Sequence, residues 1–225
     1  MIIIKPTSQQ KKKFEEERAR RILKYLFPEK YSDTSLSESP DIITNDKRTG
    51  VEVTDSGTSK FSECLSRAGD ISGKTHDELT AINKKNMSER KVTVTPVLDE
   101  RYLAGFTLWG DTHQVKKAYE KKCNILNSKH FEICKENNLF ITAWLIDDVE
   151  LFTGIEEILK DAKKKTAENN INFDIVYIWT TTILIEIDMA THSIKQHTIP
   201  EKNIDSISHD AFYAVFDMTK EEYYK

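Results

Sequence analysis

The sequence predicts an α/β fold, a sandwich in which a central mixed sheet is flanked by helices. Residues 139–146 form a nearly continuous apolar run of strand length, which is typical of a buried strand. Amphipathic patterns of helical period lie on either side of this run, at residues 113–135 and 149–162, and residues 173–180 are rich in Ile, Val, Tyr and Trp. Because helices and strands alternate along the chain, we expect one sheet with helices on its faces.

Shorter patterns near the two ends of the chain add to this sheet. Apolar residues recur at helical spacing over residues 14–27, which predicts a first helix. The β-branched residues 42–44 and the segment 51–54 are separated by a short polar loop, and this arrangement predicts a β-hairpin. Residues 183–189 and 193–199 are expected to form a second hairpin.

Length and composition favour a single domain, 1–225, that contains one insertion. The 225 residues, of which 38% are hydrophobic and 31% charged, can bury one substantial core, and no Pro/Gly linker divides the chain. Residues 55–111 are polar, Ser-rich and locally charged, with a short strand-like pattern at 92–97. Such an insertion would flank the hairpin, where it could grip a substrate, serve as a dimerisation arm or form a loop.

Several functional classes find little support in the sequence. The three cysteines include no Cys-x-x-Cys pair, which indicates a reducing compartment, and we expect a cytoplasmic protein. The six histidines show no i, i+4 pair of the kind that zinc hydrolases use, and the seven glycines form no phosphate-binding loop. No apolar run is long enough for a membrane span or a secretory signal, so no membrane partner is expected.

Two acidic residues of the first hairpin are the leading site candidates. Asp41 follows Pro40 directly before the first strand, and Glu52 lies in the returning strand. Side chains alternate between the faces of a strand, so Glu52 points away from the face of Val51 and Val53 and can stand beside Asp41. Two such carboxylates can share a hard divalent cation. An ordinary exposed hairpin with acids on its wet face is the alternative.

Helical phase selects further candidates on the two long helices. In the helix at 14–27, Glu15 falls near the middle of the apolar face and Glu16 at its edge. A carboxylate that points into an apolar interface is costly unless a cation or hydrogen bonds receive it. In the helix at 113–135, Lys122 falls on the inward stripe, with Lys129 near the edge of the same face. Alternatively, Glu15 lies at the rim and Lys122 extends its ammonium into water.

The hairpin resembles the PD-(D/E)XK nuclease superfamily, whose members have the restriction-endonuclease-like fold. The resemblance rests on Pro40-Asp41 and on the segment from Gly50 to Thr54, which has the pattern Gly-hydrophobic-Glu-hydrophobic-Thr. The superfamily usually has a lysine where this chain has Thr54. In some members that lysine has moved to the following helix, and Lys122 is then the candidate, with Lys129 as the second choice.

The resemblance implies a metal-dependent site that is spread over four elements. Asp41, Glu52 and the backbone carbonyl of Val53 would bind Mg²⁺ or Mn²⁺, Glu15 would orient the ion through water or bind a second one, and Lys122 would complete the catalytic set. The order of these elements along the chain, helix, strand, strand, helix, agrees with the superfamily core. The implied activity is hydrolysis of DNA phosphodiester bonds in a bacterial, phage or mobile-element defence context, with RNA left open as a substrate. A homodimer and a partner protein from a defence system are the other expected associations.

The distribution of charge bears on the expected nucleic-acid partner. A net charge of −4 argues against a strong non-specific nucleic-acid binder, but basic residues cluster on both predicted helices. The candidates for phosphate contacts are Lys11, Lys12, Arg18, Lys117 and Lys121. These clusters are otherwise ordinary solvated helix faces.

Two alternative functions remain at this stage. One is a catalytically inactive protein of the same fold that binds nucleic acid or serves as an assembly subunit, and the Thr54 departure favours it. The other is an unrelated α/β protein in which the acids are surface residues.

Overall fold

The fold was analysed in a computed structural model, which describes residues 7–57, 59–89, 92–97, 100–105, 114–129, 131–143, 148–168 and 170–219. It divides into two compact units. One unit comprises Met1–Ser56 together with Val115–Lys225, and the other comprises Gly57–Gln114. The second unit is close to the segment 55–111 for which an insertion was expected.

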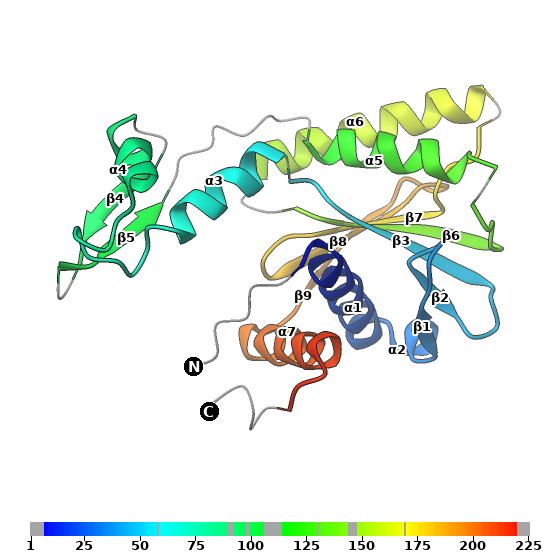
Figure 1. Cartoon of the computed structure of the whole chain (residues 1–225). Helices are drawn as coiled ribbons and strands as arrows, with labels where there is room; N and C mark the ends of the chain where they lie inside the picture. The colour runs from blue at the N-terminus through cyan, green and yellow to red at the C-terminus, as the bar shows by residue number, and fades with distance from the viewer. Residues whose placement is uncertain are drawn as a thin grey trace. The chain divides into compact units, whose positions relative to one another are not determined.

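The larger unit is built on a seven-stranded mixed sheet with the order β1-β2-β3-β6-β7-β8-β9 (Figure 1). Its strands are β1 (Thr34–Leu36), β2 (Ile42–Thr44), β3 (Thr49–Asp55), β6 (Glu136–Thr142), β7 (Ile175–Trp179), β8 (Ile183–Asp188) and β9 (Ile194–Thr198). The central pairs β3–β6 and β6–β7 are parallel, and the outer pairs are antiparallel. The predicted α/β class with a mixed sheet is therefore confirmed.

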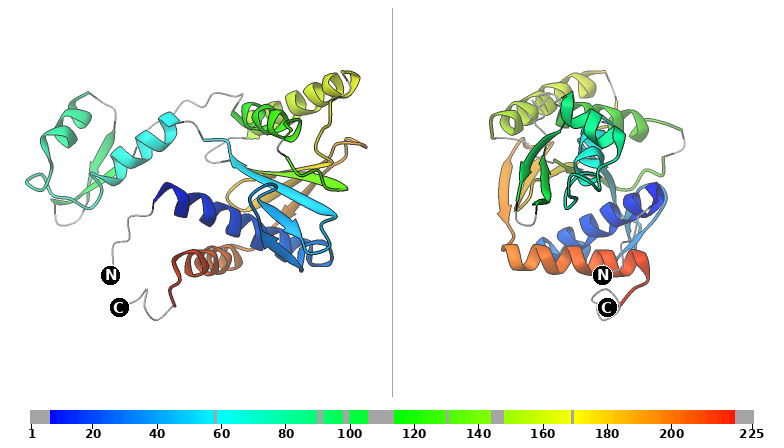
Figure 2. Two further views of the ribbon diagram at one scale, coloured as in Figure 1. Left: turned by 45° about the vertical axis from the view of Figure 1, so that its right-hand side comes forward. Right: turned by 60° about the vertical axis from the view of Figure 1, so that its left-hand side comes forward.

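Helices cover both faces of this sheet. Helices α5 (Gln114–Leu126) and α6 (Asp148–Ala167) lie on one face, and α1 (Ser8–Leu26) and α7 (Glu201–Phe216) lie on the other (Figures 1 and 2). A short helix, α2 (Pro28–Tyr31), follows α1. None of the helices in the described ranges is long and apolar enough to cross a lipid bilayer.

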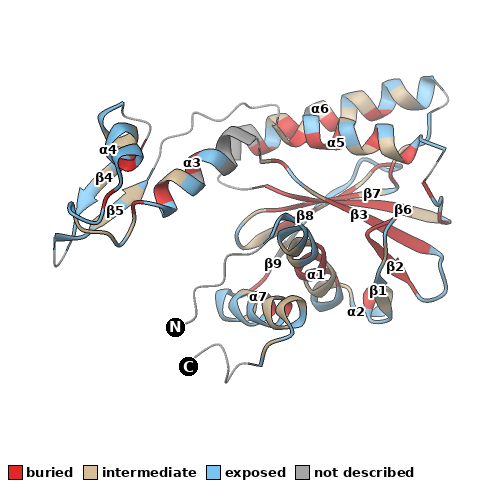
Figure 3. Ribbon diagram, viewed as in Figure 1, coloured by how far each residue is buried: buried red, intermediate tan, exposed pale blue. Residues whose placement is uncertain are grey.

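The central strands carry the core, as Figure 3 shows by their burial. Along β6, Leu139 and Ile141 face the core cluster beneath α5 and α6, whereas Phe140 faces the cluster beneath α1 and α7. Both faces of the strand are thus buried, which explains why its sequence is a continuous apolar run rather than an alternating one. Strand β6 begins at Glu136, three residues before the expected start at residue 139, and residues 144–146 of the expected strand lie outside the described ranges.

Helix α1 begins with a capping box. The Thr7 hydroxyl accepts a hydrogen bond from the Gln10 backbone N–H, at 3.2 Å, and the Gln10 side chain receives the Thr7 backbone N–H, at 3.0 Å. Together the two bonds satisfy donors that a helix start leaves unpaired. The helix ends before Pro28, which begins α2. The helix includes nearly all of the predicted range 14–27 and begins six residues earlier, at Ser8, which adds about 1.7 turns.

The second predicted helix is shorter than expected. It was predicted to reach residue 135, but α5 ends at Leu126, and Ile133, which was assigned to the inward stripe, is 48% exposed. The Asn127 amide group donates to the carbonyl oxygens of Cys123 and Ile171, both at 2.8 Å. Asn favours such side-chain bonds to the backbone over continued helix, and the apolar spacing beyond it did not reveal the break.

The smaller unit, Gly57–Gln114, has its own small core. It contains α3 (Ser59–Gly69), α4 (Ala81–Ser88) and an antiparallel pair of strands, β4 (Thr93–Pro96) and β5 (Tyr102–Gly105). The strand pattern predicted at 92–97 is confirmed by β4. The buried residues of this core are Ala68, Ile71, Leu79 and Val92.

Candidate functional site

The β2–β3 hairpin brings Asp41 and Glu52 together. Ile42 pairs with Val51 in the antiparallel register, so Asp41, one residue earlier, comes opposite Glu52. The Asp41 Oδ2 atom accepts a hydrogen bond from the Val53 backbone N–H at 2.8 Å. The side chains of Asp41 and Glu52 are only 3% and 4% exposed. The two acids are therefore buried, unlike acids on the wet face of an ordinary hairpin.

The β2–β3 hairpin has no space for a side chain at position 50. A Cβ atom added at Gly50 would lie 2.5 Å from Cγ of Pro40 and 3.0 Å from Sγ of Cys134. Any larger residue would push Pro40, and with it Asp41, away from β3. The Pro40-Asp41 and Gly50 parts of the pattern thus fit against each other.

Helix α5 places Lys122 at both carboxylates. The Lys122 ammonium nitrogen lies 2.5 Å from Glu52 Oε2 and 3.5 Å from Asp41 Oδ2, and its side chain is 12% exposed. Lys122 comes from the buried side of α5, which also presents Tyr119 and Cys123 to the core. By contrast, Lys129 is exposed and lies beyond the end of the helix, so the structure does not bring the second-choice lysine to the acids.

The first helix delivers Glu16 to this cluster, and not the predicted Glu15. The Glu15 carboxylate pairs with Arg18 at 2.5 Å, whereas Glu16 is buried, at 6% exposed. Burial raises the pKa of Glu15, and Asp55, at the end of β3, adds to this effect. A helical projection gives the direction from the helix axis toward the sheet. It does not give the lateral position of Asp41, which precedes β2 and lies to one side of β3.

Lys12 connects Glu16 to Asp41. Its ammonium nitrogen lies 3.2 Å from Glu16 Oε1 and 3.3 Å from Asp41 Oδ1, while its side chain is 65% exposed. The Glu16 Oε1 atom is buried and makes no hydrogen bond with proper geometry to any described residue. The cluster therefore has two halves that share Asp41. One half consists of Asp41 Oδ2, Glu52 and Lys122, and the other of Asp41 Oδ1, Glu16 and Lys12.

The electrostatics of the cluster follow from its burial. Burial raises the pKa of Glu52, and the Lys122 ammonium offsets this effect only in part. Burial also raises the pKa of Glu16, with the Asp41 carboxylate adding to it. Burial opposes the charge on Lys12, but Asp41 and Glu16 outweigh it and raise the Lys12 pKa. With all groups ionised, three carboxylates face two ammonium groups, which leaves an excess of one negative charge.

The donor set suits a hard divalent cation. Carboxylate oxygens are the ligands that Mg²⁺ and Mn²⁺ prefer, and the buried Glu16 Oε1 atom is available to accept one. Within the described residues, however, no group of three Asp, Glu, His or Cys side chains is arranged to hold a metal ion. Lysine ammonium groups lie between the carboxylates, at the places that a cation would take. The expected binding of a metal by the Val53 carbonyl stays a prediction, and the Val53 backbone N–H donates to Asp41 Oδ2.

The residues predicted to contact nucleic acid fall into two groups. Lys11, Lys12, Lys117 and Lys121 are exposed on α1 and α5. Arg18 is only 8% exposed, pairs with Glu15 and stacks over the Phe14 ring at 5.4 Å. Arg18 thus packs within the protein instead of lining its surface. The helical position of Arg18 did not by itself indicate that its guanidinium would form an ion pair with Glu15, three residues earlier.

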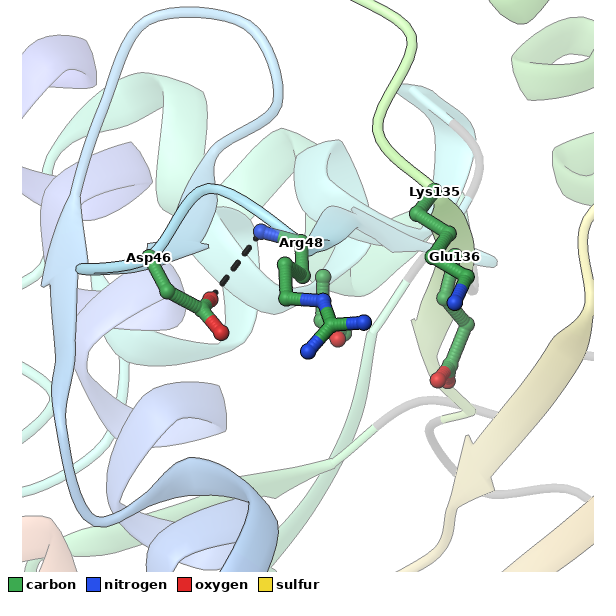
Figure 4. Close-up of a pocket in the computed structure, with 5 residues that line it drawn as sticks. Asp46, Arg48, Lys135 and Glu136 are labelled. Carbon is green, nitrogen blue, oxygen red and sulfur yellow. Dashed lines mark hydrogen bonds between the residues drawn. The ribbon is translucent and has the colours of Figure 1, made fainter.

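A separate open pocket lies at the other end of the hairpin. It is lined by Asp46, Arg48, Thr49, Lys135 and Glu136 (Figure 4). The Arg48 backbone N–H donates to Asp46 Oδ1 at 3.0 Å, and this bond closes the β2–β3 loop. None of the predicted site residues lines this pocket.

Comparisons with protein-family models, with curated proteins and with solved structures each found no match.

Proposed function

We propose that this chain is a divalent-metal-dependent endonuclease of the restriction-endonuclease-like fold that hydrolyses DNA phosphodiester bonds. One observation carries the proposal: the β2–β3 hairpin and α5, which are distant in sequence, bring the Lys122 ammonium nitrogen to 2.5 Å from Glu52 and 3.5 Å from Asp41. Burying charged groups costs free energy through desolvation, and clusters of buried titratable groups are common at functional sites. The agreement between this cluster and the Pro40-Asp41 and Gly50–Thr54 pattern supports the nuclease assignment.

In the proposed site, Asp41 and Glu52 would hold Mg²⁺ or Mn²⁺. When bound, such an ion lowers the pKa of a water molecule and offsets charge on the phosphate. The Val53 N–H fixes the orientation of Asp41, so that Asp41 Oδ1 is left to face Glu16 and Lys12. The register of the hairpin holds Glu52 opposite Asp41 and thereby sets the spacing of the two ligands.

Lys122 would take the role that the superfamily usually gives to a lysine at the position of Thr54. Its side chain is only 12% exposed, so its ammonium would reach a bound phosphate with little freedom to lose. There it would stabilise the negative charge that develops on the phosphate oxygens in the transition state. The Thr54 hydroxyl donates to the Asp55 carbonyl, at 3.4 Å, and contributes no charge.

The substrate and the partners are part of the proposal. Exposed Lys117 and Lys121 precede Lys122 on α5, and exposed Lys11 lies next to Lys12 on α1, so basic groups lie on both helices that supply the cluster. DNA is the proposed substrate, with RNA as the alternative. We further propose a cytoplasmic protein of a defence system that acts as a homodimer or with a partner, because double-strand cutting in the resembled superfamily often uses two sites.

A cleavage assay tests the proposal. Supercoiled plasmid is incubated with Mg²⁺ or Mn²⁺ and with the wild type, Asp41→Asn, Glu52→Gln, Lys122→Gln or the control Lys129→Gln. We expect cleavage by the wild type and the control, and a loss of about 100-fold or more in the other three variants. Equal cleavage by all five proteins would show that the activity comes from a contaminant and would overturn the assignment.

A second candidate is a catalytically inactive protein of the same fold that binds nucleic acid or another protein. The observation that favours it is that lysines already neutralise most of the acid cluster and that no metal-holding group is formed among the described residues. Titration with Mn²⁺ separates the two candidates. The inactive protein would bind DNA without binding Mn²⁺ at micromolar to millimolar concentrations, whereas the nuclease would lose its Mn²⁺ binding on Asp41→Asn.

A further inference from the structure

Lys12 combines an exposed side chain with two ion pairs to buried carboxylates. It is anchored at its ammonium end by Asp41 and Glu16, yet its side chain is 65% exposed. Lys122 is the reverse case, because its side chain is only 12% exposed. Lys12 can therefore leave the acids by rotating into water, whereas the less exposed Lys122 has less room to do so.

We propose that Lys12 is an exchangeable counter-ion, which occupies a cation position between Asp41 and Glu16 and is released when a divalent cation binds there. This inference rests on the proposed function, because it assumes that the acid cluster binds a metal. It goes further by assigning a distinct cation position to the Asp41 Oδ1 and Glu16 Oε1 atoms, and a role to Lys12 other than direct phosphate contact.

The charge of the cluster supports exchange at this position. Asp41 and Glu16 are buried, so without a cation between them their negative charges would repel each other in a medium of low dielectric constant. The Lys12 ammonium supplies that cation at 3.2 and 3.3 Å. Its contact with Glu16 Oε1 lacks hydrogen-bond geometry, and that oxygen is left without a hydrogen-bond partner among the described residues. A divalent ion would supply more charge and would satisfy this oxygen, and Lys12 would lose only a partly exposed ion pair.

The first test measures Mn²⁺ affinity by calorimetry with the full chain. The variants are Lys12→Gln, the matched control Lys13→Gln, which removes an exposed lysine from the next position of α1, and Asp41→Asn. Because Lys12 competes with the metal, Lys12→Gln should bind Mn²⁺ about threefold to tenfold more tightly than Lys13→Gln. Equal affinities of the two glutamine variants would overturn the inference.

The Asp41→Asn variant separates this outcome from failure of the proposed function. Loss of Mn²⁺ binding in Asp41→Asn together with equal affinities of the two glutamine variants would sink only the exchange. If the wild type and Asp41→Asn bind Mn²⁺ equally, or if neither binds it, the metal site itself is wrong and both proposals fall.

The second test compares the thermal stability of the variants with and without Mg²⁺. An exchangeable counter-ion and a fixed structural ion pair predict different effects of Mg²⁺ on that stability. Without divalent ions, Lys12→Gln should unfold at a lower temperature than Lys13→Gln, since Asp41 and Glu16 lose their counter-ion. Saturating Mg²⁺ should remove this difference, because the bound ion replaces the ammonium group. A difference that persists unchanged in Mg²⁺ would mean that Lys12 is a fixed structural partner and would contradict the exchange.

Discussion

At the scale of single residues, the cluster is defined by the pairing of buried charges. Glu52 and Lys122 form an ion pair of 2.5 Å with side chains that are 4% and 12% exposed. Such a pair adds little net stability, because desolvation of the two groups offsets their attraction. Removing only one partner is costly, since the other charge is then left buried without compensation.

A double-mutant cycle tests this pairing. Lys122→Met should lower the free energy of unfolding by about 3 kcal/mol, because Glu52 is left unpaired, whereas Lys129→Met, at an exposed site, should change it by less than about 0.5 kcal/mol. Adding Glu52→Gln to Lys122→Met should recover most of the loss. Urea denaturation of the wild type, Lys122→Met, Glu52→Gln, the double variant and the control provides the measurement, and strictly additive effects of Lys122→Met and Glu52→Gln would refute the pairing.

Gly50 is the other residue whose role follows from its contacts. Gly50→Ala should destabilise the protein by about 1–3 kcal/mol, because the new methyl group would lie 2.5 Å from Pro40 Cγ. Gly154→Ala is the matched control, since its methyl group would meet Val115 at an ordinary 3.4 Å and Ala favours helix α6. Thermal unfolding should therefore show a lower midpoint for the first variant and an equal or higher one for the second. Equal midpoints would indicate that Pro40 moves aside freely.

At the scale of secondary-structure elements, α1 carries two kinds of buried acid. Glu16 faces the site with an incomplete set of partners, whereas Glu17 is held by Arg20 and Arg21, at 2.8 and 2.7 Å. Arg21 also lies 3.6 Å from Asp210 of α7, so this second group connects the two helices on that face of the sheet. One element thus serves both the fold and the candidate site from adjacent positions.

The Glu17 group predicts a dependence of stability on pH. Burial alone would raise the Glu17 pKa, but its bonds to Arg20 and Arg21 outweigh burial and lower the pKa below 4.5. A lowered pKa in the folded state stabilises the protein above the pKa of the unfolded state, and this stabilisation is lost as the pH falls through the folded-state pKa. Glu17→Gln should therefore cost about 2 kcal/mol at pH 7 and progressively less below about pH 4.5.

Urea denaturation at a series of pH values checks this prediction. Glu156→Gln, at an exposed position of α6, is the control and should behave like the wild type throughout. A cost of Glu17→Gln that is the same at pH 3.5 and pH 7 would show that its charge does not matter.

At the scale of the whole molecule, the chain has two units with separate cores. The larger unit buries both faces of a seven-stranded sheet, whereas the core of Gly57–Gln114 has four buried hydrophobic residues in its main cluster. A core of that size buries little apolar area, so it contributes correspondingly little stability. The two units should therefore differ in how often they open.

Hydrogen exchange tests this difference. Amides of β3, β6 and β7 should exchange only with global unfolding, whereas those of the β4–β5 pair should exchange through local opening and be protected at least about 100-fold less. Mass spectrometry of peptides from the two units gives the measurement. Equal protection in both units would show that they unfold as one body.

Elements whose sequence pattern reflects their own burial could be predicted, whereas features that depend on contacts with distant segments could not. The strands β6 and β7 were predictable because burial on both faces leaves an apolar run in the sequence. The end of α5 was not, because apolar spacing continued past Asn127, whose side-chain bond to Ile171 depends on a distant segment. Helix α7 was not expected either, since its apolar residues acquire an inward face only when α1 and the sheet are in place.

Some features of the candidate site could be predicted from local sequence, and others depend on tertiary packing. By itself, the sequence determined the α/β class and the approach of Asp41 to Glu52, because hairpin register and strand alternation are local properties. It also assigned Lys122 correctly to the inward side of its helix. Only the tertiary structure decided that Glu16 and Lys12, and not Glu15, reach Asp41. That choice depends on where α1 crosses the sheet relative to β2, and the position is set by packing against the sheet and α7 rather than by the helix's own period.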